Sequence, residues 1–295
     1  MQNTTTSATI NERYRRFIEQ IDNLPSLPAI VSRLIQVVNS PDTSAEDAAK
    51  LIQRDPALTT KMLRLANSAF YGIPRSISSV SSAVVILGFN TIRSLVLSAT
   101  VMKLFSSDSG KSIDKGMFWK HSIVCAMTAK TIVRQFINIR MMDPESAFCA
   151  GILHDIGKLI FSEFARKDYD DVCTYAKGKS IPLLQAETEI LGINHADIGR
   201  ILADKWALPL DLEYALVYHH DPAKAESLTD LVTTVHMADI LTHRAGVGIW
   251  ENEAVTDEWK DARRILRMGD AEYDRIMQAL VDNVDKAGEF IDIIR

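Results

Sequence analysis

The chain has 295 residues, of which 47% are hydrophobic and 24% charged, and a formal net charge of −5. These values are ordinary for a folded globular protein, and the acidic balance excludes a general nucleic-acid or anionic-membrane surface. No apolar run approaches the roughly 18 residues that span a bilayer, and the first residues lack the features of a signal peptide. Cys125, Cys149 and Cys173 form no CxxC pair, so we expect a cytoplasmic protein without a disulfide framework or a zinc knuckle.

The N-terminal third is expected to fold as short helices with clear starts and stops. After a polar tail, apolar residues between Ile10 and Ile21 follow helical spacing, and the proline-containing stretch 24–28 is a stiff connector to the next helix. Ser44 with Asp47 makes a variant capping box, and Asp55 precedes a proline at the start of a further helix. The remaining expected features are a helix over residues 78–87 ended by Gly88, a cap at Asn90 for a helix over residues 91–105, and a linker at residues 106–110.

The short helices that begin after Ser44 and after Asp55 are joined by a tight turn, and the pair allows a helix-turn-helix interpretation. DNA-binding helices of that kind carry a basic recognition face, and no arginine-rich face accompanies this pair. Nucleic acid is therefore not an expected partner.

The second half is predicted to be helical as well, and its helices carry most of the histidines. His121 is expected early in a helix that continues to Val133, and His154 and Asp155 within a helix capped by Asp143 and running through Ile160. His195 is expected at the start of a helix, and His219 and His220 at the end of a helix that begins near Pro209. Asp239 is expected within a helix over residues 229–241. Nothing alternates apolar and polar residues for long. The predicted fold class is therefore all-α, a multi-helix bundle.

The last fifty residues, 246–295, are predicted to add helices over residues 259–268 and 271–291. Their apolar stripe is flanked by many acidic positions. We expect this extension to pack back on the bundle, and the alternative is a helix that faces a second copy or a partner.

His154 and Asp155 stand side by side in an otherwise apolar run that begins at Gly151. Buried imidazole and carboxylate groups are costly unless they are paired or bound to a metal, and neighbours on a helix, about 100° apart, can reach one cation. A single histidine on an apolar helix is more often a core residue. His236 and His243 are interpreted in that way.

The other histidines and one more aspartate follow these two residues in a recognisable order. The full set is His121, His154, Asp155, His195, His219, His220 and Asp239. This order resembles the ligand order of the HD superfamily of metal-dependent phosphohydrolases, and the adjacent histidine pair resembles its HD-GYP branch, which hydrolyses cyclic dinucleotides. The resemblance implies that these seven residues bind metal, and that Lys158, which matches a lysine of the phosphohydrolase motif, holds a phosphate oxygen.

The ligand types indicate which ions would fit. Imidazole combined with carboxylate favours iron or manganese, with zinc as the alternative, so one or two divalent ions are expected. Asp155 would bridge two ions, with His121 and His154 on one side, the other three histidines on the opposite side, and Asp239 closing the set. Two ions about 3.5–4 Å apart can activate a water and neutralise a phosphoryl oxygen. The competing interpretation is a polar network that holds the core together without any ion.

A second resemblance covers roughly residues 24–245 and rests on several specific motifs. They are Leu24-Pro25-Ser26-Leu27-Pro28, Asp55-Pro56-Ala57-Leu58, Leu65-Ala66-Asn67-Ser68, Tyr71-Gly72, Ala83 to Gly88, Gly151 to Leu159, Glu187 to Gly199, Trp206 to Pro209, and His219-His220-Asp221-Pro222. These motifs are similar to those of the HDOD family, the HD-related output domains of bacterial signalling proteins. The resemblance implies a tail and helix at 1–23, an N-terminal helical part at 24–110, an HD-like part carrying the site at 111–245, and an extension at 246–295.

The chain departs from the HD-GYP enzymes directly after the double histidine. His220 is followed by Asp221-Pro222-Ala223-Lys224, without a Gly-Tyr-Pro motif. The preferred function is therefore a bacterial signalling module, at most weakly catalytic, that binds a partner protein, with a nucleotide, a metal ion or a second copy of the chain as further ligands.

Two alternatives to that function stay open. The first is a metal-dependent phosphohydrolase or phosphodiesterase acting on a nucleotide or cyclic dinucleotide, with Asp155 among its metal ligands and Lys158 as its substrate clamp. The second is a sensor whose iron oxidation state or bound gas is the signal.

Overall fold

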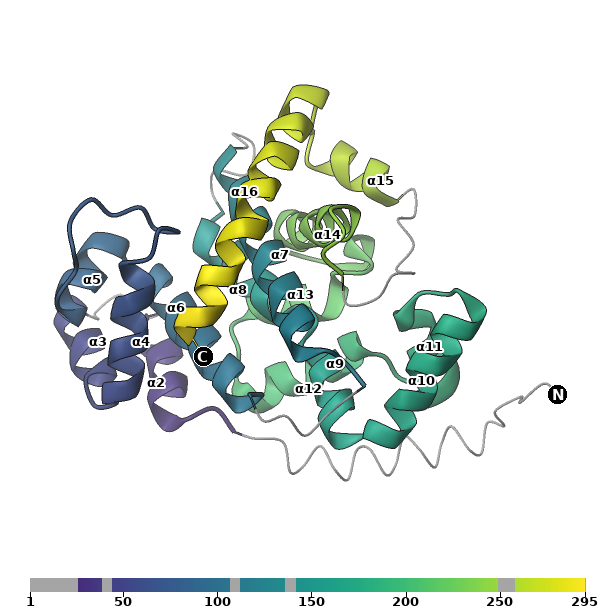
Figure 1. Ribbon diagram of the computed structural model, residues 1–295, viewed down its shortest axis with the longest axis horizontal. Coiled ribbons are helices and arrows are strands. Elements are labelled where there is room, and N and C mark those ends of the chain that lie inside the picture. The colour runs from purple at the N-terminus through teal and green to yellow at the C-terminus, as the bar shows by residue number, and fades with distance from the viewer. Residues whose placement is uncertain (1–25, 39–43, 107–111, 136–141, 249–257, 295) are drawn as a thin grey trace.

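A computed structural model of the protein describes residues 26–38, 44–106, 112–135, 142–248 and 258–294 (Figure 1). These residues form helices and connecting turns with no strand, so the predicted all-α class is confirmed. The helices are α2 Ala29–Val38, α3 Ala45–Ile52, α4 Pro56–Ala66, α5 Val80–Leu87, α6 Phe89–Leu104, α7 Lys115–Gln135, α8 Pro144–Leu153, α9 Ile156–Phe164, α10 Arg166–Lys179, α11 Leu183–Leu191, α12 His195–Trp206, α13 Leu210–Tyr218, the 3-10 turn η2 Pro222–Lys224, α14 Thr229–Arg244, α15 Glu258–Ile265 and α16 Asp270–Ile294. The predicted helix between Ile10 and Ile21 and most of the linker at 106–110 lie outside the described residues.

Several helices start where the sequence places a capping side chain. Ser44 accepts a hydrogen bond from the Asp47 backbone N–H, and the Asp47 carboxylate accepts one from the Ser44 N–H, each at 3.2 Å. Asp55 and Asp143 accept from the third residue of α4 and of α8 at 3.0 and 3.1 Å. These side chains satisfy amide groups that would otherwise have no partner in the first helical turn.

The predicted cap at Asn90 is wrong. Helix α6 begins two residues earlier than predicted, at Phe89, and its N-cap is Gly88, with φ of +84°. A glycine adopts that angle without the cost that a side chain would add, so the chain turns directly from α5 into α6 with a bend of 120°. Within the described part of the chain, no single helix is long and apolar enough to cross a membrane, and the bent pair α5–α6 meets that criterion only jointly.

The single helix predicted across His154 and Asp155 is interrupted. Helix α8 ends at Leu153 and α9 begins at Ile156, so that both residues lie in the turn between them. Asp155 has φ −99° and ψ 5°, outside the helical region. The change of direction allows both side chains to point toward the same interior space.

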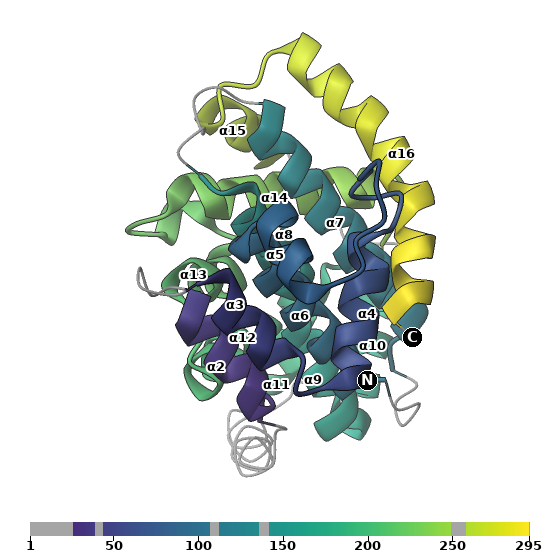
Figure 2. The same cartoon turned by 90° about the vertical axis from the view of Figure 1, so that its left-hand side faces the viewer.

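The helices are arranged around a central pair, α7 and α8. Helices α2 to α5 lie on one side of this pair, and α10 with α11 forms an outlying hairpin on the other (Figures 1 and 2). Helix α6 connects the N-terminal helices to the centre, and every residue from Thr91 to Met102 is buried. One continuous hydrophobic core extends from Leu27 to Ile294.

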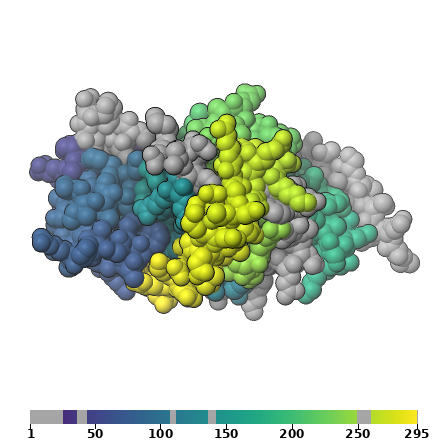
Figure 3. All heavy atoms as spheres, turned by 90° about the horizontal axis from the view of Figure 1, so that it is seen from above, coloured from purple at the N-terminus to yellow at the C-terminus, as the bar shows by residue number. Residues whose placement is uncertain are grey.

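The C-terminal helix α16 packs back on the bundle, as expected. It crosses the molecule from α15 to the N-terminal helices and contacts α7, α4 and α6 (Figure 3). Near its end, the Phe290 ring packs against Phe70 and Phe148, with centroid distances of 6.1 and 5.8 Å. Lys61 of α4 donates a hydrogen bond to the carbonyl oxygen of Ile294. The extension therefore joins the first helices of the chain to its centre.

Candidate metal centre

Side chains that are far apart in the sequence meet in the core between α7, α8, α12, α13 and α14. Helices α7 and α14, which carry His121 and Asp239, pack side by side, and His195 is the first residue of α12. The structure brings together all seven residues that the sequence singled out, which are His121, His154, Asp155, His195, His219, His220 and Asp239. All of them are buried except His220, which is partly exposed.

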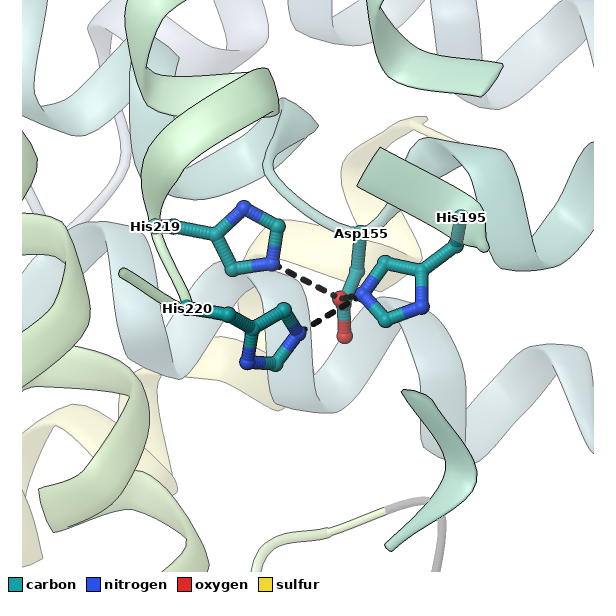
Figure 4. A group of neighbouring side chains, drawn as sticks. All are labelled: Asp155, His195, His219 and His220. Carbon is teal, nitrogen blue, oxygen red and sulfur yellow. Dashed lines mark hydrogen bonds and ion pairs between the residues drawn. The ribbon is translucent and has the colours of Figure 1, made fainter. Parts of the chain in front are cut away.

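The seven donors form two groups, within each of which the potential ligand atoms lie within 4.8 Å of one another. The first group is Asp155, His195, His219 and His220, and the second is His121, His154 and Asp239. Figure 4 shows the first group, with the three imidazoles arranged around the carboxylate. This division matches the one that the sequence predicted for a two-ion site.

Asp155 lies between the two groups. Its Oδ1 is 3.3 Å from His195 Nε2 and 3.6 Å from His219 Nε2. Its Oδ2 is 3.4 Å from His154 Nε2 and 3.7 Å from His121 Nε2. Each oxygen therefore faces one group, which is the arrangement of a bridging carboxylate.

Hydrogen bonds at the far side of three of the rings turn Nε2 toward the centre. His121 Nδ1–H donates to the backbone carbonyl of Val247, and His154 Nδ1–H donates to that of Gly151, both at 2.8 Å. His219 Nδ1 lies 3.0 Å from the Ala215 carbonyl oxygen. In a neutral imidazole, a nitrogen that donates its proton outward leaves the other ring nitrogen with a free lone pair, which is the usual state of a metal-binding histidine.

Several polar atoms of the site have no hydrogen bond of good geometry to any described residue. They are Oδ1 of Asp155, Oδ1 of Asp239 and Nε2 of His219. Buried polar atoms normally have a partner, and exceptions often mark the place of an ion or a water. A cation between these nitrogens and oxygens would satisfy all of them, so the donor set fits a metal ion.

The charges of the site favour a cation as well. Burial raises the pKa of the Asp155 carboxyl, but Lys158 and His154 outweigh it and hold that pKa well below its usual range. Burial lowers the pKa of His154, yet the two nearby carboxylates raise it to about 10, while burial lowers the pKa of His219 to about 4. The Asp155 and Asp239 carboxylates are therefore ionised at neutral pH, as metal binding requires, and a bound ion would have to displace the proton that His154 holds without metal.

Lys158 lies inside the site and not at its surface. The side chain is 1% exposed, and its Nζ is 2.8 Å from Asp155 Oδ2. The lysine thus places a fixed positive charge beside the carboxylate that divides the two groups.

Two residues next to the site were not predicted from the sequence. His243, interpreted as a core histidine, has its Nε2 3.4 Å from Asp239 Oδ1 and its ring 4.6 Å from that of His121. Its spacing of four residues from Asp239 on one helix was the available signal. Glu187 was noted in a family motif without a role, and its Oε2 lies 2.6 Å from His195 Nδ1. An acidic residue on the apolar side of a helix was the signal there.

Comparisons with known proteins show the family of the chain. The HDOD domain family matches residues 24–222, and the chain belongs to this family. A protein of Treponema pallidum is 25% identical over 223 residues, 75% of this chain but 42% of that protein, so the chain spans less than half of its length.

Solved structures agree with this assignment. The HDOD domain protein of Geobacter sulfurreducens, of unknown function, superposes with a TM-score of 0.80 at 27% identity, over 97% of this chain and 99% of its own. A proposed phosphohydrolase of Shewanella amazonensis has the same fold, with a TM-score of 0.75 at 24% identity, over 95% of this chain and 98% of its own.

Proposed function

We propose that the chain is a regulatory HDOD protein that binds one or two divalent ions, iron or manganese in preference to zinc, and acts on a partner protein. The observation that supports metal binding is the pair of donor groups with Asp155 between them. The absence of a Gly-Tyr-Pro motif after His220 favours regulation over efficient hydrolysis.

Bound ions would add direct links between segments that packing and hydrogen bonds already hold together. The ligands belong to α7, the α8–α9 turn, α12, the end of α13, and α14. Because an ion fixes its ligands within a few tenths of an ångström, its presence would set the relative positions of these helices. A partner that contacts more than one of them would then distinguish the loaded from the metal-free protein.

Metal content of the purified full chain tests the first part of the proposal. We expect elemental analysis to find iron or manganese in the wild type, and His154→Ala to lose most of it while keeping its helical circular dichroism. Dialysis against a chelator should lower the melting temperature, because free metal at 100 times its dissociation constant stabilises the folded state by about 2.7 kcal/mol. A fully folded wild type that neither contains nor takes up any transition metal would exclude the site.

Partner binding is tested by comparing two baits. The metal-loaded wild type should retain a protein that His154→Ala, folded but unable to bind metal, does not. Equal capture by both baits would contradict the link between metal and output.

A phosphohydrolase is the second candidate, and Lys158 is the observation that favours it. Metal ions at this site would polarise a phosphate ester and activate water. Lys158, held beside Asp155, would neutralise a phosphate oxygen of a bound substrate, and the Shewanella amazonensis structure is itself a proposed phosphohydrolase. Cyclic dinucleotides, nucleotides and a generic phosphodiester should be turned over by metal-loaded wild type and not by Lys158→Met or His154→Ala. No turnover across this panel would leave the regulatory function.

A further inference from the structure

Glu187 of α11 is a fully buried carboxylate directly behind His195. Its Oε2 accepts hydrogen bonds from Nδ1–H of His195 at 2.6 Å and from the backbone N–H of His195 at 2.8 Å. Its Oε1 accepts from the hydroxyl of Tyr169 at 2.8 Å. The pKa of Tyr169 is raised well above its usual value, chiefly by burial, so the hydroxyl keeps its proton and remains a donor. Three donors therefore converge on one carboxylate that has no contact with solvent.

Burial of the Glu187 carboxylate costs free energy, and packing alone does not explain why a carboxylate occupies this position. A buried carboxylate is unfavourable unless its charge is used, and an apolar residue of the same size would fill the position more favourably. The carboxylate faces His195 through both the ring and the backbone, so it fixes the position and the tautomer of that residue. With the proton on Nδ1, Nε2 presents its lone pair to the site, 3.3 Å from Asp155 Oδ1 and 2.7 Å from His220 Nε2.

The partner of the His195 Nδ1–H differs from the partners of the other histidines described above. His121, His154 and His219 donate to backbone carbonyls, which carry no net charge. Hydrogen bonding to a carboxylate increases the electron density of an imidazole more than hydrogen bonding to a carbonyl does, and it strengthens the ring as a ligand. The two donor groups are therefore unequal.

We propose that Glu187, held by Tyr169, is the positioning residue of His195, and that it makes the group of Asp155, His195, His219 and His220 the tighter of the two metal sites. This inference rests on the proposed metal binding. It concerns which donor group binds the first metal ion, and which residue outside the ligand set makes that group bind it more tightly.

Titration of the full-length, metal-free protein with Mn²⁺, followed by the electron paramagnetic resonance of the free ion, tests the proposal. Glu187→Gln keeps the shape of the side chain and removes its charge. We expect it to weaken the tightest Mn²⁺ site about 10–100-fold, and Tyr169→Phe to weaken it less because two of the three donors remain. A folded Glu187→Gln protein with the wild-type dissociation constant would overturn the proposal.

Glu189→Gln is the matched control. Glu189 lies two residues further along α11 and also accepts a hydrogen bond from a tyrosine, Tyr175 at 2.7 Å, but it is exposed, and its other hydrogen-bond partner is Gln185. The same chemical change there should leave Mn²⁺ binding unaltered. Equal loss in both variants would show a general effect of the charge of α11 and would count against a specific role for Glu187.

The tautomer of His195 gives a readout that needs neither metal nor a variant of Glu187. Long-range ¹⁵N–¹H correlation spectra of the metal-free wild type, assigned with His195→Gln, should show the proton on Nδ1 and none on Nε2. A neutral ring with its proton on Nε2 and none on Nδ1 would overturn the inference. If the wild type bound no Mn²⁺, the proposed function would fail, while this spectrum would still decide whether Glu187 positions the ring.

Discussion

Gly157, in the first turn of α9, allows that helix to approach α12 closely. A Cβ atom at this position would lie 2.1 Å from the carbonyl oxygen of His195, well inside contact distance. The obstacle is backbone, which cannot move away as the end of a side chain could. The distance between His195 and Asp155 therefore depends on the missing side chain at Gly157.

Gly157→Ala is expected to separate α9 from α12 and to lower both stability and metal affinity. The overlap should cost at least the 1–3 kcal/mol typical of overpacked cores, in addition to any loss of metal. Thermal unfolding with and without Mn²⁺ would measure both effects.

Gly178→Ala provides the comparison. Gly178 lies in α10 with no atom within 4 Å of its ideal Cβ position, so alanine should be neutral or stabilise the helix by up to about 1 kcal/mol. If the two substitutions had the same effect, close approach at Gly157 would not be the reason for that glycine.

Helices α7 and α8 are joined by a buried ion pair between Lys130 and Glu145. The lysine is 2% exposed, and its ammonium lies 4.8 Å from the ring centroids of Phe70 and Tyr71 and 5.4 Å from that of Phe148. Burial lowers the pKa of Lys130, so its charge depends on the carboxylate beside it and on the aromatic faces around it. The pair contributes specificity to the packing of α7 on α8 and on the turn that follows α4.

Removal of one partner of this pair should be strongly destabilising. Glu145→Gln leaves a buried ammonium without a counter-charge, and we expect a loss of about 3–5 kcal/mol in the free energy of unfolding, measured in urea. Replacement of both residues, Lys130→Met with Glu145→Leu, should recover most of that loss. A double variant as unstable as the single one would show that the charges themselves are needed.

An exposed ion pair serves as the control for this prediction. Lys50 and Glu46 lie 2.9 Å apart on the surface of α3, with side chains 63% and 72% exposed. Solvent screens such a pair, so Glu46→Gln should leave the urea midpoint unchanged within error.

At the scale of the whole molecule, α16 joins parts of the chain that are far apart in sequence. Phe290 is 1% exposed and packs between the turn that follows α4 and the middle of α8, and the Glu289 carboxylate accepts from the backbone N–H of Ala69 at 3.3 Å. The N-terminal helices, the helices around the donor groups and the last helix thus share one core. We expect them to unfold together.

Phe290→Ala should lower the free energy of unfolding by about 3–5 kcal/mol, because it leaves a cavity where three elements meet. Calorimetry should still show a single transition at a lower temperature. Val281→Ala, on the same helix but 56% exposed, should leave that temperature unchanged. Two separate transitions in the wild type would mean that α16 does not couple the two ends of the chain.

The sequence by itself determined the features that depend on neighbouring residues or on a fixed order. Helical spacing and capping residues such as Ser44, Asp55 and Asp143 act within one or two turns, so the all-α class and most helix starts could be predicted. The candidate donors could be named because their order along the chain, from His121 to Asp239, is itself a signal.

The tertiary structure decided the rest, because distances between helices depend on packing and not on spacing along the chain. The break at His154 and Asp155, the division of the donors into two groups and the position of Lys158 against Asp155 all follow from how α7, α9, α12 and α14 meet. Glu187 and His243 are both present in the sequence, but their roles could not be predicted from it. Their contacts with His195 and Asp239 became visible only when the side chain behind each donor was known, since a buried polar group takes its role from the partner that packing gives it.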